Sequence, residues 1–154
     1  GALDLGLVRW QEQWAESLRN SAAAKSFFLL SGKSTDDVIA MRGWQAMYRS
    51  GAQWRREVLE MLGGDSQALK LTALDGRSLD VIWVPVPNAA GTALLFHANA
   101  QVNLDMAEHA RWYKDQNIES VLVSMGGYGE SEGPTTELNS YIDAQSVLQW
   151  VLDQ

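Results

Sequence analysis

Apolar residues recur every three or four positions over the first 64 residues, which is the period of an α-helix. Leu7, Trp10, Trp14 and Leu18 predict a first helix over residues 3–20. Ser34 or Thr35 is the expected N-cap of a second helix, because two aspartates follow in the first turn, where negative charge is favoured. This second helix is expected to be interrupted near Gly51 and to end at Gly63-Gly64. Its apolar positions are Val38, Met41, Trp44, Met47 and Tyr48 before the interruption and Trp54, Val58 and Met61 after it.

The pattern changes after residue 64, where short apolar runs alternate with helix-like stretches. Residues 69–74 and 79–86 predict two strands joined at Asp75-Gly76, a dipeptide typical of a tight hairpin turn. The other expected elements are strands at 92–96 and 120–124 and helices at 106–116 and 137–152, the last with Ile142, Val147, Leu148 and Val151 facing inward. Alternation of strand and helix predicts an α/β fold in which a hairpin precedes parallel strands with crossover helices. The expected organisation is a helical N-terminal segment, residues 1–64, followed by an α/β core, residues 65–154.

Composition narrows the function classes. The chain has 154 residues, of which 46% are hydrophobic and 20% charged, in the range of a soluble globular domain. Its net charge of −7 argues against binding nucleic acid, which needs clustered Lys and Arg. It has no cysteine, which excludes disulfides, a thiolate nucleophile and thiolate metal sites.

The N-terminus bears on localisation and on membrane contact. It lacks the basic start and long apolar core of a secretory signal, which favours the cytoplasm over secretion. Its Trp-rich helices leave membrane contact open, but Trp at helical spacing more often packs in a core, and the segment is not notably basic.

Two short motifs invite cofactor interpretations that the residues do not support. In "LLSGKST", a phosphate-binding loop would need a glycine where Phe27 stands, so a loop leading into a capped helix is favoured. His97, Glu108 and His109 could suggest a metal site, but adjacent residues on a helix point about 100° apart. We expect neither a metal nor a cofactor.

Four motifs in the second half occur in a characteristic order. They are Asp75-Gly76 with Leu79 in the hairpin, "HANA" (97–100) after the third strand, "GGYGESEG" (126–133) after the fourth strand, and Asp143 in the final helix. Residues 71–152 resemble the N-terminal half of a serine α/β-hydrolase of the esterase, lipase and acyl-thioesterase type. The resemblance implies hydrolysis of a small carboxylic ester or thioester.

This family resemblance assigns roles to individual residues. It implies that the backbone N–H of Asn99 is one oxyanion-hole donor, in a turn shaped by Ala98, because ester hydrolysis passes through a tetrahedral oxyanion. His97, Gly127, Tyr128, Gly129 and Ser131 are expected as structural support, with His97 as a strand-end residue and not the catalytic base.

The sequence departs from the family pattern at three points. Ala98 replaces the usual glycine, which a turn with φ below zero tolerates. Gly126 or Gly127 replaces the usual arginine, so a structural ion pair is expected to be absent. No GxSxG nucleophile motif occurs, so the nucleophile and the triad are expected outside residues 1–154.

Sheet order supports the expectation of a partial domain. The family places its third strand between the fourth and the fifth, and without a fifth strand residues 92–96 would form an uncovered apolar edge. We therefore expect the missing C-terminal half, on the same chain or a separate fragment, to be a partner, and residues 1–154 to be inactive alone. The alternative is a catalytically dead hydrolase-like binding or scaffold protein, which the substitutions at 98 and 126 favour slightly.

Overall fold

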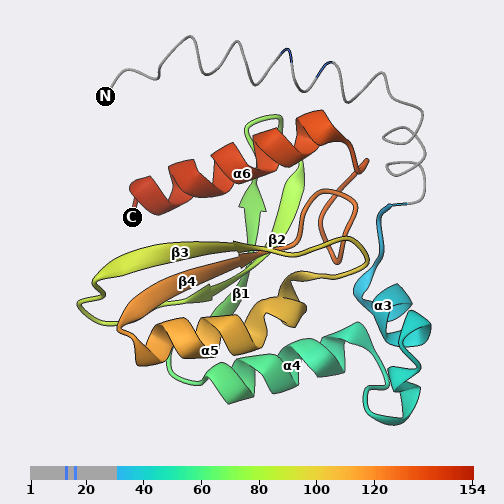
Figure 1. The fold of residues 1–154 in the computed structure, drawn as a ribbon, viewed down its shortest axis with the longest axis horizontal. Coiled ribbons are helices and arrows are strands. Elements are labelled where there is room, and N and C mark those ends of the chain that lie inside the picture. The colour runs from blue at the N-terminus through green and yellow to red at the C-terminus, as the bar shows by residue number, and fades with distance from the viewer. Residues whose placement is uncertain (1–12, 14–15, 17–30) are drawn as a thin grey trace.

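The computed structural model describes residues 13, 16 and 31–154 (Figure 1). In chain order the elements are α3 (Thr35–Met41), η1 (Trp44–Ala46), α4 (Gly51–Leu62), β1 (Gln67–Thr72), β2 (Ser78–Val84), β3 (Gly91–Phe96), η2 (Asn103–Met106), α5 (Ala107–Asp115), β4 (Ile118–Val123) and α6 (Glu137–Leu152). The predicted first helix and the phosphate-loop glycine position at 27 lie outside the described residues.

Four strands form one mixed sheet in the order β1-β2-β4-β3. β1 and β2 are an antiparallel hairpin, β2 pairs antiparallel with β4, and β3 pairs parallel with β4, with Gly91 opposite Ile118 and Phe96 opposite Val123. The predicted turn closes the hairpin, since Gly76 has a φ of 90° and Ala73 N–H donates to Arg77 O at 2.8 Å. The mixed α/β sheet expected from the sequence is thus present.

The sheet has a separate core on each face. One core packs α3, α4, η2 and α5 against Ile82, Val84 and Leu122 of β2 and β4. The other packs α6, through Val147, against Leu79, Val81, Val121 and Val123. Figure 1 shows the resulting layers, with α6 on one side of the sheet and α5, backed by α4, on the other.

The second predicted helix is divided, and this corrects the sequence expectation. Ser34 caps α3 as one of the two expected caps, with a reciprocal hydrogen bond to Asp37. The helix then ends at Met41, and Gly43 takes a left-handed φ of 69° before the short η1. A second cap, Ser50, begins α4 at Gly51, so Gly51 starts a helix where an interruption was expected.

One inward assignment in α6 was also wrong. Val147 is fully buried, as expected, but Leu148 is 47% exposed. Adjacent helical residues point about 100° apart, so Val147 and Leu148 cannot both face the sheet squarely. Leu148 lies instead on the outer face of α6.

Candidate functional site

His97, directly after β3, is held with both ring nitrogens occupied. Met125 N–H donates to Nε2 at 3.0 Å, so Nδ1 carries the proton and donates to the carbonyl oxygen of Ala98 at 2.8 Å. Burial lowers the pKa of His97, against opposing effects of the Ala98 carbonyl and the Asp105 charge. A neutral imidazole with no free nitrogen ties the end of β3 to the end of β4.

The residues after His97 form the turn on which the oxyanion prediction depends. Ala98 N–H donates to the side-chain oxygen of Gln101 at 2.9 Å, whereas Asn99 N–H has no acceptor among residues 31–154. The left-handed residue of this turn is Ala100, with a φ of 59°, and Ala98 is not among the described residues with positive φ. Alanine at position 98 is therefore compatible with the turn.

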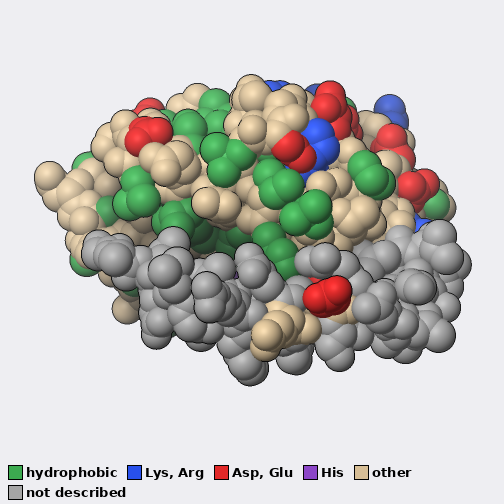
Figure 2. Space-filling view, turned by 90° about the horizontal axis from the view of Figure 1, so that it is seen from above, with side chains coloured by type: hydrophobic (Ala, Val, Ile, Leu, Met, Phe, Trp, Pro, Cys, Tyr) green, Lys and Arg blue, Asp and Glu red, His purple; other side chains and the backbone are tan. Residues whose placement is uncertain are grey.

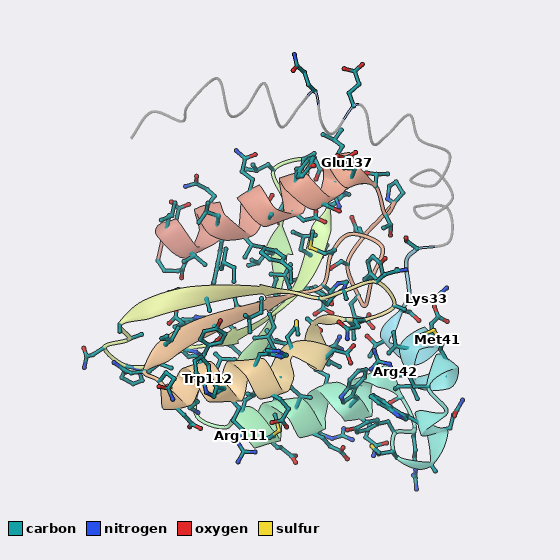
Figure 3. The ribbon with its side chains drawn as sticks, in the orientation of Figure 1. Lys33, Met41, Arg42, Arg111, Trp112 and Glu137 are labelled. Atoms are coloured by element: carbon teal, nitrogen blue, oxygen red, sulfur yellow. The ribbon has the colours of Figure 1, made fainter. Side chains whose placement is uncertain are left out.

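Arg42 binds this turn through the carbonyl of Ala100. It follows α3, forms an ion pair with Asp105, and donates from Nη2 to the carbonyl of Ala100 at 3.2 Å. In Figure 3, Arg42 and Lys33 lie near α3 on one side of the molecule. The residues around α3 therefore contribute to the candidate site.

Tyr128 connects the two predicted site segments. Its hydroxyl donates to Asn99 Oδ1 at 2.7 Å, and its ring stands edge-on to the His97 ring with centroids 4.8 Å apart. The side chain is buried. The Asn99 side chain is thereby fixed to the loop that follows β4.

Gly127 and Gly129 allow that loop to turn tightly. Their φ values are 85° and 56°, a region that favours glycine. A Cβ on Gly127 would lie only 2.1 Å from Thr135 Oγ1, and one on Gly129 would lie 2.7 Å from Ser124 Oγ. Both positions combine positive φ with close packing, so a larger residue at either would displace the loop.

Ser131 closes the loop back onto the sheet. Its hydroxyl donates to Ser124 O at 2.6 Å and accepts from Asp80 N–H at 2.8 Å. Asp80 is almost fully buried and pairs with Arg55 of α4 at 3.1 Å. Because Ser131 is buried and committed to this network, its hydroxyl is not positioned as a nucleophile.

Glycine stands where the resemblance expects an arginine, but a buried ion pair lies beside Gly126 with its arginine on the hairpin. Arg77 directly follows the hairpin turn Asp75-Gly76. Its Nη2 lies 2.7 Å from Asp143 Oδ1. Gly126 N–H donates to the other carboxylate oxygen at 2.7 Å. Burial raises the pKa of Asp143, while the Gly126 N–H and Arg77 act in the opposite direction.

Gly126 is what makes room for this arrangement. A Cβ at position 126 would lie 2.6 Å from Arg77 Nη1. Glycine at 126 and arginine at 77 therefore belong together. Sequence reasoning missed Arg77 because its partner, Asp143, is 66 residues away.

An open pocket of about 270 Å³ lies between the two predicted segments. It is lined by Phe96, His97, Ala98, Asn99, Met125, Tyr128, Thr135 and Ser140. The hydroxyls of Thr135 and Ser140 donate to the carbonyls of Gly126 and Thr136. The described lining therefore offers apolar surface and includes Asn99, but it has no hydroxyl paired with a free base.

Among the residues that the structure describes, no three His, Asp or Glu side chains are placed to hold a metal ion. His109 and Glu108 are both exposed on α5. Within the same part of the chain, every helix is too short or too polar to cross a bilayer.

Solved structures of hydrolases share this arrangement of strands and helices. An esterase from Pyrococcus furiosus superposes with a TM-score of 0.56 at 15% identity, over 62% of this chain and 38% of that one. The chain has a partial α/β-hydrolase fold. An α/β-hydrolase from Vibrio vulnificus matches with a TM-score of 0.56 at 18% identity, over 78% of this chain and 41% of that one.

A serine hydrolase without a lid, from Xanthomonas campestris, matches at 26% identity with a TM-score of 0.50. That match covers 60% of this chain and 46% of the other. No family model matches the sequence, and no curated protein matches it. The chain thus spans less than half the length of the hydrolase-fold structures it resembles, with β3 bordering only β4 in the described sheet.

Proposed function

We propose that residues 1–154 are the N-terminal part of a serine hydrolase that cleaves a small carboxylic ester or thioester. The observation that carries this proposal is the Asn99 N–H, which has no acceptor among residues 31–154 and belongs to a residue lining the pocket at the end of β3. An uncommitted backbone donor in a fixed turn is the type of group that stabilises an oxyanion. Its fixation comes from His97, Tyr128 and Arg42, which hold the turn from three sides.

Hydrolysis needs groups that this pocket lacks. The nucleophilic serine, its histidine base and the acid would come from the C-terminal half of the domain, next to β3, on the same chain or a separate fragment. The serine hydroxyl would pass its proton to the histidine and attack the carbonyl carbon, and the Asn99 N–H would donate to the resulting oxyanion together with the N–H that follows the nucleophile. Collapse of the oxyanion would release the alcohol or thiol, which takes the proton from the histidine, and water would then release the acid from the serine. Residues 1–154 alone are inactive in this proposal.

A fluorophosphonate probe, which labels activated serines, tests whether the nucleophilic serine lies outside residues 1–154. Residues 1–154 are expected to stay unlabelled, and protein extended past Gln154 through a GxSxG strand is expected to be labelled. Labelling of residues 1–154 alone would overturn the proposal. Absence of labelling in both would favour the alternative of a catalytically dead binding protein.

The role of Asn99 needs variants that separate its N–H from its side chain. Asn99→Pro removes the N–H, and Asn99→Ala keeps it while losing the bond from Tyr128. In the extended protein we expect Asn99→Pro to lower kcat about 10²–10³-fold, as loss of one oxyanion donor does elsewhere. Asn99→Ala is the matched control and should retain most activity. Equal losses in the two variants, with folding verified by circular dichroism, would remove the N–H from the mechanism.

A further inference from the structure

His97 holds the same peptide group that contains the candidate oxyanion donor. Its Nδ1–H donates to the carbonyl oxygen of Ala98 at 2.8 Å, and this carbonyl and the Asn99 N–H belong to one planar peptide group. The group is trans, so its oxygen and its N–H point in opposite directions. By holding the oxygen, the imidazole ring therefore sets the direction in which the Asn99 N–H points.

The turn around this peptide group is anchored on both sides by contacts that do not involve the ring. Before the group, Ala98 N–H donates to Gln101 Oε1 at 2.9 Å. After it, Arg42 donates to the carbonyl of Ala100 at 3.2 Å. A planar peptide group can rotate about the two single bonds that flank it while its neighbours stay in place. Loss of the bond from the ring would thus redirect the N–H and leave the turn anchored.

Protonation of His97 is an event that breaks this arrangement. The second ring nitrogen, Nε2, accepts from Met125 N–H at 3.0 Å, and it is the atom at which this neutral imidazole takes up a proton. Once protonated, Nε2 is a donor that faces another donor, so the ring cannot keep its position. Nδ1 moves with the ring, and the Ala98 carbonyl either follows it or loses it. Both results rotate the peptide group.

The surroundings of the ring allow this protonation. His97 is half-buried and lines the open pocket, which gives solvent access to the ring. The described titratable groups that face it are Asp105 of η2, which is paired with Arg42, and Tyr128, whose ring stands edge-on to it. From α6 the pocket receives the uncharged Ser140, and Figure 2 shows that uncharged surface predominates on the α6 side. Burial lowers the pKa of His97, and the Asp105 charge opposes this effect.

We propose that His97 is a proton-dependent positioning residue for the Asn99 N–H. The neutral ring fixes the direction of this N–H, and protonation of Nε2 lets the peptide group rotate. Acid therefore changes the direction of the donor without unfolding the turn. The effect on hydrolysis rests on the proposed function, whereas the rotation itself does not.

NMR spectroscopy of the isotope-labelled 154-residue protein tests the rotation without any need for activity. Between pH 7.5 and pH 4.5, the ring signals of His97 and the amide signals of Met125 and Asn99 should shift with one common midpoint below pH 6.5. An Asn99 amide that does not follow the His97 titration would overturn the proposal. A ring that stays neutral over this range, or a chain that unfolds before the ring titrates, would also overturn it.

The chain has two histidines, so the second one provides a matched control. His97→Gln should abolish the common transition at Met125 and Asn99, because glutamine does not titrate. His109→Gln should keep it, because His109 is exposed on α5. Persistence of the transition in His97→Gln, or its loss in His109→Gln, would assign it to another group and contradict the proposal. If His97→Gln does not fold, the titration of the native sequence still decides the outcome.

The protein extended past Gln154 connects the rotation to hydrolysis. Below the midpoint, kcat of the native sequence should fall about tenfold per pH unit more steeply than kcat of His97→Gln, because one more group must be unprotonated. Equal slopes would overturn the link between the ring and the oxyanion donor. Absence of hydrolysis in the extended protein would count against the proposed function, and the NMR titration would still decide whether the ring moves the peptide group.

Discussion

At the scale of single residues, the absence of a side chain at Gly126 makes room for the Arg77 guanidinium. The guanidinium occupies the space that a side chain at 126 would need, and it neutralises the fully buried Asp143. It also reaches Asp75 at 2.8 Å and the Glu132 carbonyl at 3.2 Å. One side chain therefore joins the hairpin, the loop after β4 and α6.

Arg77→Met should destabilise the fold by about 3 kcal/mol, because removing one partner leaves a buried charge without compensation. Chemical denaturation followed by circular dichroism measures the change. Arg111→Met, on an exposed arginine of α5, is the matched control and should change stability by less than about 0.5 kcal/mol. A loss in Arg77→Met no larger than in the control would show that the pair does not hold the loop.

His97 gives a prediction about pH. Burial lowers its folded-state pKa below the ordinary histidine value of 6.5, so the unfolded chain binds a proton more readily than the folded one. The resulting stability is present above pH 6.5 and is lost as the pH falls toward the folded pKa. Denaturation at pH 7.5 and 5.5 should therefore show a larger loss for the native protein than for His97→Gln, which does not titrate.

Because both proteins keep all other titratable groups, including Asp143, the difference between them isolates the pH dependence that His97 contributes. Glutamine also keeps an acceptor for Met125 N–H, so the two proteins differ mainly in the titration. The same pH dependence in both proteins would contradict the neutral, half-buried imidazole.

At the scale of elements, β3 is the edge of the described sheet. It pairs only with β4, and its residues are exposed or half-buried, unlike the central β2. Such an edge offers unpaired backbone groups to another strand. In the proposed function this edge receives the fifth strand.

Thr92→Lys should reduce self-association of residues 1–154. Thr92 is exposed and stands opposite Glu119 in the register, so lysine there adds a favourable cross-strand pair while charging the edge. Sedimentation velocity over a range of concentrations measures the effect. Gln45→Lys, with the same charge change on η1, is the control, and equal reduction by both would indicate net charge rather than edge pairing.

The divided helix between α3 and α4 shows where sequence periodicity failed. An isolated glycine is tolerated in many helices, so Gly43 did not by itself predict a break. Ser50, which caps α4 by accepting from Gln53 N–H at 3.2 Å, was the missed signal. Arg42 follows the end of α3 and binds the Ala100 carbonyl, and no local sequence pattern predicts this contact.

At the scale of the whole molecule, the α/β sheet and most of its strands and helices could be predicted because their signals are local. Asp75-Gly76 marks the hairpin, and unbroken apolar runs mark β3 and β4. Leu148 was misplaced because its neighbour Val147 is equally apolar, and only packing decides which faces the sheet. The family resemblance directed attention to Asn99, but its uncommitted N–H is visible only in three dimensions.

The tertiary contacts of the site were beyond sequence reasoning for a physical reason. A structural ion pair was expected to be absent because glycine replaces the usual arginine before the GYG motif, and the sequence did not indicate that Asp143 pairs with Arg77. A carboxylate requires a cation nearby, not a cation at a particular sequence position. The hairpin provides it from 66 residues away.

The fit between Arg77 and Gly126 has a consequence for related sequences. In relatives of this chain, positions 77 and 126 should change together: where 126 is arginine, 77 should be small or uncharged, and where 126 is glycine, 77 should be arginine. A lineage that passed through arginine at both positions would have had to fit two guanidiniums around one carboxylate. A relative with arginine at neither position would leave that carboxylate buried without a cation, so such relatives are expected to be rare.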